Sequence, residues 1–277
     1  MQAAAPALAL EHITVTFVAD GDVRGSEAAA ARFTAIRDTT LVVRPGEFVS
    51  VVGPTGCGKS TLLNVAAGLL APSAGEVRVF GEPLAGLNGK AGYLFQSEAL
   101  LPWRTALDNV SVGLEFRGVA REEIVRRAEG WLQRVGLRGH GHRYPHQLSG
   151  GMRKRVALAQ TLILDPQIIL MDEPFSALDI QTRQLMENEL LELWSADRKS
   201  VVFITHDLEE AISLSDRVVV LSAGPGSHPI GEYEIDLPRP RDVAEIRLAP
   251  RFIELHTKIW QVMKEEVLKG YEQQKNQ

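Results

Sequence analysis

The stretch Gly53-Pro54-Thr55-Gly56-Cys57-Gly58-Lys59-Ser60 is the most informative segment of this 277-residue chain. It follows the apolar run 48–52 and precedes a helix-like segment that begins at Thr61. Glycines let successive backbone N–H groups turn inward around phosphate oxygens, where a Cβ atom would interfere. Lys59 adds a positive charge, Ser60 can ligate Mg²⁺, and the N-terminus of the following helix attracts anions. The segment therefore predicts a nucleoside triphosphate ligand; the alternative is a glycine-rich turn that binds nothing.

The composition favours a globular, cytosolic protein without a nucleic-acid partner. Hydrophobic residues make up 45% of the chain, and the formal net charge is -5. This content suffices for a full core, whereas the charge provides no basic footprint for DNA or RNA. The single cysteine, Cys57, cannot form an internal disulfide, which favours a reducing compartment. Because Cys57 lies inside the glycine-rich loop, we expect bound nucleotide to slow its alkylation.

No segment has the pattern of a leader or of a membrane span. Residues 1–10 are rich in alanine but lack the basic region of a secretory signal. No apolar run approaches the roughly 18 to 20 residues that cross a bilayer. If a membrane is involved, we expect another protein to provide it.

Strand-like and helix-like patterns alternate along most of the chain. We expect strands over residues 10–17, 41–43, 75–80, 92–95, 167–171, 200–204 and 217–221, and helices over 178–194 and 208–214. Such alternation predicts an α/β fold with a mainly parallel sheet that is covered on both faces. Between residue 106 and about residue 164 the apolar spacing becomes helical, with Gly136 as a stop, which predicts an inserted helical subdomain. Residues 18–32 predict a long hairpin loop, with a short helix as the alternative.

The C-terminal segment has a different character. Leu237-Pro238-Arg239-Pro240-Arg241 predicts a rigid, extended connector. The apolar residues that share one face of a last helix are Phe252, Leu255, Ile259, Met263 and Val267. We expect this helix to dock on its own domain, with partner binding as the alternative. The chain thus divides into a main domain over residues 1–236, with the helical subdomain at about 97–164, and a tail over 237–277.

A buried strand ends in two carboxylates. The run Ile168-Ile169-Leu170-Met171-Asp172-Glu173 places both acids at the carboxyl edge of a parallel sheet, beside the glycine-rich loop. We expect Asp172 to hold Mg²⁺, since a hard cation prefers oxygen ligands on a rigid element. Glu173 is then placed to accept a hydrogen bond from water, as a general base or a positioning group. In isolation, the same residues often form only a solvated turn.

A second anion site is suggested by Leu148-Ser149-Gly150-Gly151-Met152, which precedes a helical run. Ser149 and the glycines lie where a helix exposes unpaired N–H donors. A generic helix N-cap explains Ser149 equally well. One chain does not ordinarily need two separate triphosphate cradles.

Together these segments resemble the nucleotide-binding subunit of an ABC transporter, from residue 10 to about residue 221. The matching motifs are Walker A (53–60), Walker B (168–173), the signature (148–152), the D-loop (Ser176-Ala177-Leu178-Asp179), the Q-loop residue Gln96 and the H-loop residue His206. The resemblance implies a P-loop NTPase fold with an N-terminal antiparallel β-subdomain, and ATP and Mg²⁺ as ligands. It also implies a homodimer in which the signature of one copy closes on the ATP that Walker A of the other copy holds.

The resemblance also implies roles for single residues. His206 would contact the γ-phosphate and hold the attacking water, which makes it a catalytic residue together with Glu173. Gln96 would sense Mg²⁺ and the same water, as a catalytic residue and a metal ligand. Phe17 would stack on the adenine ring. Ordinary capping by His206 and an ordinary core position for Phe17 remain alternatives.

In the implied dimer, the ATP held by one copy is also contacted by residues of the other copy, namely Ser149, Gly150, Gly151, Met152 and Asp179. Met152 departs from the glutamine that is more common at the end of the signature. This puts one side-chain contact in doubt, while the backbone donors of Ser149 and Gly151 remain. We expect Arg153-Lys154-Arg155, which follows, to be a solvated helix face.

The resemblance implies a two-state clamp, in which ATP closes the dimer and hydrolysis lets it open. The apolar segment Ala99-Leu100-Leu101-Pro102-Trp103-Arg104 is suited to receive a short helix of a permease, with burial in its own domain as the alternative. Residues 100–110 and 237–241 look like importer ATPases for nitrate, aliphatic sulfonates and taurine. This implies a separate permease, a periplasmic solute-binding protein that acts indirectly, and a peripheral position at the cytoplasmic face of the inner membrane.

Three other functions remain open. The chain could serve an exporter or a lipid-trafficking complex, or act as a soluble ATP-dependent switch. Soluble relatives usually carry two cassettes or a long coiled-coil insertion, and the sequence has neither pattern. An inactive nucleotide-binding scaffold is the last alternative, and the presence of Glu173 and His206 argues against it.

Overall fold

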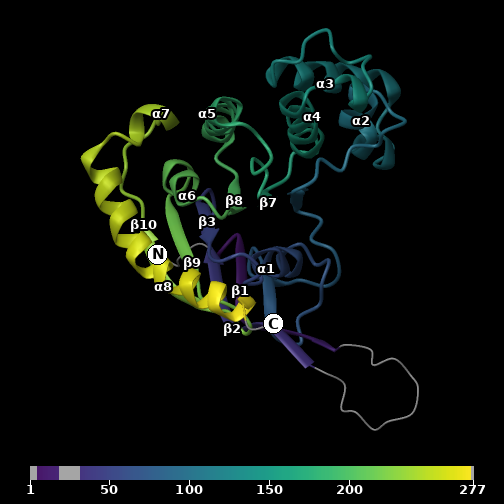
Figure 1. Ribbon diagram of the computed structural model, residues 1–277. Helices are drawn as coiled ribbons and strands as arrows, with labels where there is room; N and C mark the ends of the chain where they lie inside the picture. Colours follow the sequence, from purple (N-terminus) through teal and green to yellow (C-terminus); the bar gives the residue numbers. More distant parts are fainter. Residues whose placement is uncertain (1–4, 19–31, 276–277) are drawn as a thin grey trace.

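A six-stranded sheet of short strands forms the centre of the computed structural model, which describes residues 5–18 and 32–275 (Figure 1). Its strand order is β10-β9-β3-β8-β7-β6. The strands are β3 (Phe48–Val52), β6 (Ala91–Leu94), β7 (Ile168–Asp172), β8 (Ser200–Ile204), β9 (Arg217–Leu221) and β10 (Pro229–Glu234). All neighbouring pairs are parallel except β10 and β9. Buried parallel strands explain the continuous apolar runs in the sequence.

Strand β3 shows how the two faces of this sheet are covered. Val49 and Val51 join the apolar cluster around α1 (Lys59–Ala66). Phe48 packs on the other face, with its ring 5.6 Å from that of Trp194 in α5 (Ile180–Asp197). The sheet is therefore buried between two layers, as the expected α/β fold requires.

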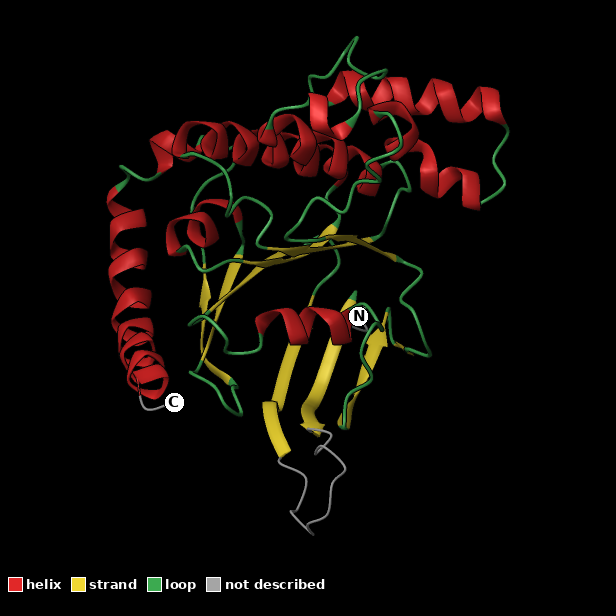
Figure 2. Cartoon of the chain, turned by 45° about the vertical axis from the view of Figure 1, so that its right-hand side comes forward, coloured by secondary structure: helices red, strands yellow, loops and turns green. Residues whose placement is uncertain are grey.

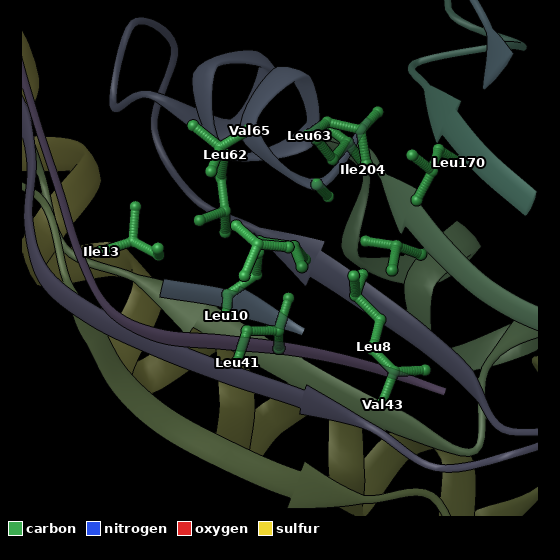
Figure 3. Close-up of a cluster of buried hydrophobic side chains, with 14 of the residues drawn as sticks. Leu8, Leu10, Ile13, Leu41, Val43, Leu62, Leu63, Val65, Leu170 and Ile204 are labelled. Carbon is green, nitrogen blue, oxygen red and sulfur yellow. The ribbon is translucent and has the colours of Figure 1, made fainter. Parts of the chain in front are cut away.

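A second sheet, of four antiparallel strands, packs against the α1 side of the central sheet. Its order is β2-β1-β4-β5, with the strands β1 (Leu8–Val18), β2 (Arg32–Val43), β4 (Ala74–Val79) and β5 (Glu82–Pro83). Leu62, Leu63 and Val65 of α1 lie among apolar side chains from both sheets (Figure 3). The loop that leads into α1 is consequently anchored to a rigid core.

Three helices form their own hydrophobic cluster beyond one end of the central sheet (Figure 1). They are α2 (Ala106–Phe116), α3 (Arg121–Arg134) and α4 (Gly150–Leu162), and a short 3₁₀ turn, η1 (Pro145–Gln147), precedes α4. Thr105 begins α2 by accepting the Asp108 N–H at 3.2 Å. Gly136, with φ of 71°, follows the end of α3, which is the expected helix stop.

The C-terminal helix, α8 (Pro250–Lys275), runs along one flank of the molecule and packs on α6 (Leu208–Leu214) (Figure 2). The expected docking of this helix on its own domain is confirmed. Its buried apolar residues are Phe252, Leu255, Ile259 and Met263. The expectation for Val267 is wrong, because its side chain is 38% exposed. Glu266 turns inward instead, and its Oε2 accepts the Ala223 N–H at 2.7 Å.

The structure agrees with most expected elements and adds three. Helix α7 (Val243–Ile246) and strands β5 and β10 were not expected. Strand β10 contains a proline and a glycine and lies at the edge of the sheet, where such residues are tolerated. Residues 19–31, which make up nearly all of the expected hairpin loop, lie outside the described residues. The division of the chain at residue 236 stays a prediction.

The connector at 237–241 contains neither helix nor strand, as expected. Arg241 is nevertheless buried, and its guanidinium donates to the carbonyls of Ser215 at 2.8 Å and Leu237 at 3.0 Å. The segment is therefore bound to the main domain along its length. Within the described parts of the chain, none of the helices combines the length and the apolar character that a bilayer span requires.

Candidate functional site

A cleft of about 450 Å³ lies at the carboxyl edge of the central sheet. The glycine-rich loop after β3 contributes Thr55, Gly56 and residues 58–61. Gln96, Glu173 and His206 follow β6, β7 and β8, and Phe17 comes from β1. The structure thus brings most of the predicted site residues into one cavity. Their chemical roles remain predictions.

The glycine-rich loop has the backbone that a phosphate cradle requires. Gly56 and Gly58 have φ of 79° and 95°, which residues with a Cβ rarely adopt. A Cβ on Gly58 would also lie 3.1 Å from Ile36 Cγ1. Lys59 is 5% exposed, and its Nζ donates to the Gly53 carbonyl at 2.9 Å and to the Pro54 carbonyl at 3.0 Å. The ammonium group is therefore held across the loop.

Cys57 does not present its side chain to the cleft. The residue is 1% exposed and belongs to the core cluster around α1. Burial raises the pKa of the thiol, against the lowering effect of the Lys59 charge. The expectation that bound nucleotide protects Cys57 from alkylation is wrong in its premise, because the thiol is already shielded by the fold.

Ser60 and Asp172 face each other where Mg²⁺ was expected. The Ser60 hydroxyl donates to Asp172 Oδ1 at 3.0 Å. Burial raises the pKa of Asp172, and the hydrogen bond from Ser60 opposes this shift. Among the described residues, no three His, Cys, Asp or Glu side chains are grouped so that they alone could hold a metal ion. A hydroxyl and a carboxylate still suit Mg²⁺ that is also bound to phosphate oxygens.

Glu173, which follows β7, contacts residues that follow the two neighbouring strands β6 and β8. Its Oε2 lies 3.0 Å from His206 Nδ1 and accepts the Gln96 amide at 3.5 Å. Its backbone has φ of 42°, in the left-handed region, and its N–H donates to the Ile204 carbonyl at 2.9 Å. Backbone strain of this kind concentrates at functional sites. The side chain is aimed into the cleft from a conformation that the sequence could not indicate.

Two aromatic side chains flank the cleft on the side of the antiparallel sheet. Phe17 and Phe33 are paired in the register of β1 and β2, and they are 42% and 52% exposed. Both line the cavity. The alternative of a buried core position for Phe17 is therefore wrong. Phe33 was missed, because its place opposite Phe17 depends on the strand register.

The signature and the D-loop lie outside this cleft. Ser149 caps α4 by accepting the Met152 N–H at 3.3 Å, and Asp179 caps α5 by accepting the Thr182 N–H at 3.0 Å. The Met152 side chain packs against the helical cluster. A Cβ on Gly151 would lie 2.9 Å from Thr182 Cγ2, so glycine permits the close approach of α4 to α5. A second anion site at Ser149 stays a prediction.

The expected solvated face at Arg153-Lys154-Arg155 is wrong. Lys154 is 3% exposed, and its Nζ donates to the Gln96 carbonyl at 2.5 Å. Burial lowers the pKa of this ammonium group. Arg155 pairs with Glu189 at 2.6 Å. Lys154 faces the Q-loop and Arg155 faces α5, because α4 lies between these two elements. Only the tertiary structure determines this placement.

The segment Ala99–Arg104 combines the two alternatives considered for it. Trp103 is 72% exposed, whereas Leu100 packs into the clusters of both the core and the helical subdomain. The fully buried Asn109 holds the segment by accepting the Leu101 N–H at 2.7 Å and donating to its carbonyl at 3.1 Å. An exposed aromatic ring is thus presented on a fixed backbone.

The chain is similar to known proteins over most of its length. Residues 36–176 match the family model described as ABC transporter. The chain is 46% identical over 264 residues to an uncharacterised ABC transporter ATP-binding protein of Methanocaldococcus jannaschii, covering 95% of this chain and 93% of that protein. It is 46% identical over 192 residues to a taurine import ATP-binding protein of Yersinia pestis, covering 69% and 75% of the two chains. It is 39% identical over 255 residues to a nitrate import ATP-binding protein of Synechococcus elongatus, covering 91% and 37%.

A solved structure has the same architecture. It is the dimeric post-hydrolysis state of the ATP-binding cassette MJ0796 bound to ADP and phosphate. The TM-score is 0.70 at 32% sequence identity, and the match covers 83% of this chain and all of the other. The expected fold class is confirmed by this similarity.

Proposed function

The chain belongs to the ABC transporter family and is an ATP-binding ATPase, and from this premise we propose that it energises the import of a small solute such as nitrate, a sulfonate or taurine. The observation that carries the proposal is the convergence of Lys59, Glu173 and His206 on one cleft. The import role is supported by the taurine and nitrate import proteins among its relatives. None of the relatives named above is described as an exporter or a soluble switch.

In the proposed reaction, a water oxygen attacks the γ-phosphorus while the bond to the bridging oxygen breaks and ADP leaves with the electron pair. Glu173 accepts a hydrogen bond from that water. It then either takes the proton of the water, as a general base, or only orients the water for attack. His206 holds the Glu173 carboxylate in place from 3.0 Å. Lys59 and the loop N–H groups bind the phosphate oxygens.

Mg²⁺ fits the oxygen donors of this site. Ser60 and Asp172 would hold it directly or through water, with Gln96 at its edge. When bound, the ion would neutralise charge that develops on the phosphate oxygens. Phe17, and Phe33 opposite it, would stack on the adenine ring.

A second copy of the chain completes the proposed site. Ser149 caps the N-terminus of α4 and lies outside the chain's own cleft. In the proposed head-to-tail dimer this helix start, with Gly150, Gly151 and Met152, would contact the ATP of the partner, and Asp179 would lie at the interface. The dimeric form of the similar cassette supports this arrangement.

Coupling to transport would use the fixed segment that exposes Trp103. We expect a short permease helix to dock there, at the cytoplasmic face of the membrane, with a periplasmic solute-binding protein acting through the permease. The segment connects Gln96, which lines the cleft, to α2.

The test is ATP hydrolysis by the full chain and by Glu173→Gln, with Glu122→Gln as the matched control. Glu122 is an exposed carboxylate on α3, remote from the cleft. We expect Glu173→Gln to abolish phosphate release while ATP still binds, and Glu122→Gln to retain the parent rate. Equal rates for Glu173→Gln and the parent would refute the assignment. The import role is tested separately, by co-purification with a permease and uptake of the named solutes.

A further inference from the structure

Arg183 lies one turn into α5, directly behind the D-loop. Its side chain turns back toward the helix N-terminus, as helical side chains do, and Nη2 donates to the Leu178 carbonyl at 3.2 Å. Nη1 donates to Asp207 Oδ2 at 3.2 Å, and Nε lies 3.6 Å from Glu210 Oε1. One planar guanidinium therefore contacts the D-loop on one side and the segment after β8 on the other.

The two carboxylates that Arg183 contacts hold the backbone on either side of His206. Asp207 Oδ1 accepts two N–H groups in the first turn of α6, which leaves Oδ2 for the arginine. Glu210 Oε2 accepts the Thr205 hydroxyl at 2.5 Å, and Thr205 Oγ1 accepts the Asp207 N–H at 3.0 Å. The network thus fixes the peptide from which the imidazole projects.

We infer that Arg183 is a positioning residue that couples the placement of the D-loop to the contact between His206 and Glu173. The inference rests on the proposed function and deepens it. In the proposed dimer the D-loop faces the second copy, whereas His206 serves the ATP of its own chain, so Arg183 links the arrival of the partner to the catalytic carboxylate.

Burial strengthens this link. The Arg183 side chain is 22% exposed and that of Glu210 is 4% exposed, so their attraction is only weakly screened by solvent. A displacement of about 1 Å at a reacting centre can lower a rate by roughly 100-fold. A modest loosening of the His206 backbone is therefore measurable.

The test is the kcat and the KM for ATP of full-length Arg183→Met, Arg183→Lys and Arg155→Met. Arg155 is the matched control: its side chain is 23% exposed, pairs with Glu189 at 2.6 Å and donates to the Val135 carbonyl at 3.3 Å, away from the D-loop and from His206. We expect Arg183→Met to lower kcat by roughly 10- to 100-fold, and to change KM by less than about threefold. Arg183→Lys, which cannot form the two-sided fork, should recover part of this loss. Arg155→Met should keep the parent kcat.

A double-mutant cycle with Asp207→Asn separates positioning from stability. If Arg183 acts through Asp207, the losses in kcat of the two single variants do not add in the double variant. The inference is overturned if Arg183→Met keeps a parent-like kcat. It is also overturned if the losses in kcat of the two single variants add in the double variant and are proportional to the fall in melting temperature. If the parent chain hydrolyses ATP and Arg183→Met does so equally fast, only the inference fails. If the parent chain hydrolyses no ATP, the proposed function fails as well.

Discussion

His206 Nδ1 lies 3.0 Å from Glu173 Oε2, across the ends of the neighbouring strands β8 and β7. The Glu173 N–H also donates to the carbonyl of Ile204, at the end of β8. Side chain and backbone of Glu173 are therefore both tied to the same adjacent strand. This arrangement gives the carboxylate one orientation toward the cleft.

Removal of the imidazole should slow hydrolysis more than it weakens binding. We expect His206→Ala to lower kcat by roughly 100- to 10,000-fold, because the Glu173 carboxylate loses its partner. The affinity for ADP should change by less than about threefold, since Lys59 and the loop are untouched. Phosphate release and calorimetric ADP binding measure the two quantities. His142→Ala, at an exposed histidine, is the control, and a parent-like kcat in His206→Ala would contradict the assignment.

Phe17 should contribute more than Phe33 to the stacking on adenine. Phe17→Ala should raise the Kd for ATP roughly fivefold, the equivalent of about 1 kcal/mol, and leave kcat unchanged. Phe33→Ala, on the neighbouring strand of the same pair, should have a smaller effect. Calorimetric titration of both variants checks this. If only Phe33→Ala weakens binding, the platform is Phe33 and the role given to Phe17 is wrong.

The buried thiol should be inert in the folded chain. Cys57 is 1% exposed, and burial raises the pKa of its thiol, so little thiolate is available. Mass spectrometry after maleimide treatment should show slow labelling with and without ATP, and rapid labelling in denaturant. Fast labelling of the folded chain that ATP suppresses would mean that Cys57 faces the cleft after all.

A buried carboxylate should make stability fall with rising pH. Burial, with the nearby Glu210 charge, raises the pKa of Glu187 to about 8 from its ordinary value of 4.5. Between these two values the folded chain keeps the proton that the unfolded chain releases. The free energy of unfolding therefore loses up to about 1.4 kcal/mol per pH unit from this group, and the loss ends above the folded pKa.

Glu187→Gln should flatten that dependence. Urea unfolding between pH 5 and about pH 8 should show the variant gaining stability relative to the parent as pH rises. Glu192→Gln, at an exposed position on the same helix, should run parallel to the parent. A constant difference between Glu187→Gln and the parent would mean that Glu187 is ionised throughout.

The fold was largely predictable because its strands are buried on both faces and read as uninterrupted apolar runs. Strands β8 and β9 and helix α6 have the expected bounds. The glycine-rich loop was predictable because positive φ values at Gly56 and Gly58 leave little choice of residue. Strand β10 was not, since its proline and glycine resemble a loop.

The parts of the site that escaped prediction depend on tertiary neighbours. Phe33 reaches the cleft through its register with Phe17, and Lys154 is buried because the Q-loop carbonyl lies beside α4. The orientation of Cys57 follows from the core beneath the loop. The left-handed backbone of Glu173 is a local strain that its residue type does not signal.

The central claim is that each ATP is shared between Walker A of one copy and the signature of the other. It is tested by mixing two variants of the Glu173→Gln chain, one with Lys59→Ala and one with Ser149→Arg, and counting the ATP retained per dimer. Separately, neither variant should form an ATP-bound dimer. The mixture should form a dimer that retains about one ATP per two chains, because one of its shared sites combines an intact Lys59 with an intact Ser149. Retention of ATP in a dimer of the Ser149→Arg variant alone, or no gain on mixing, would contradict the account.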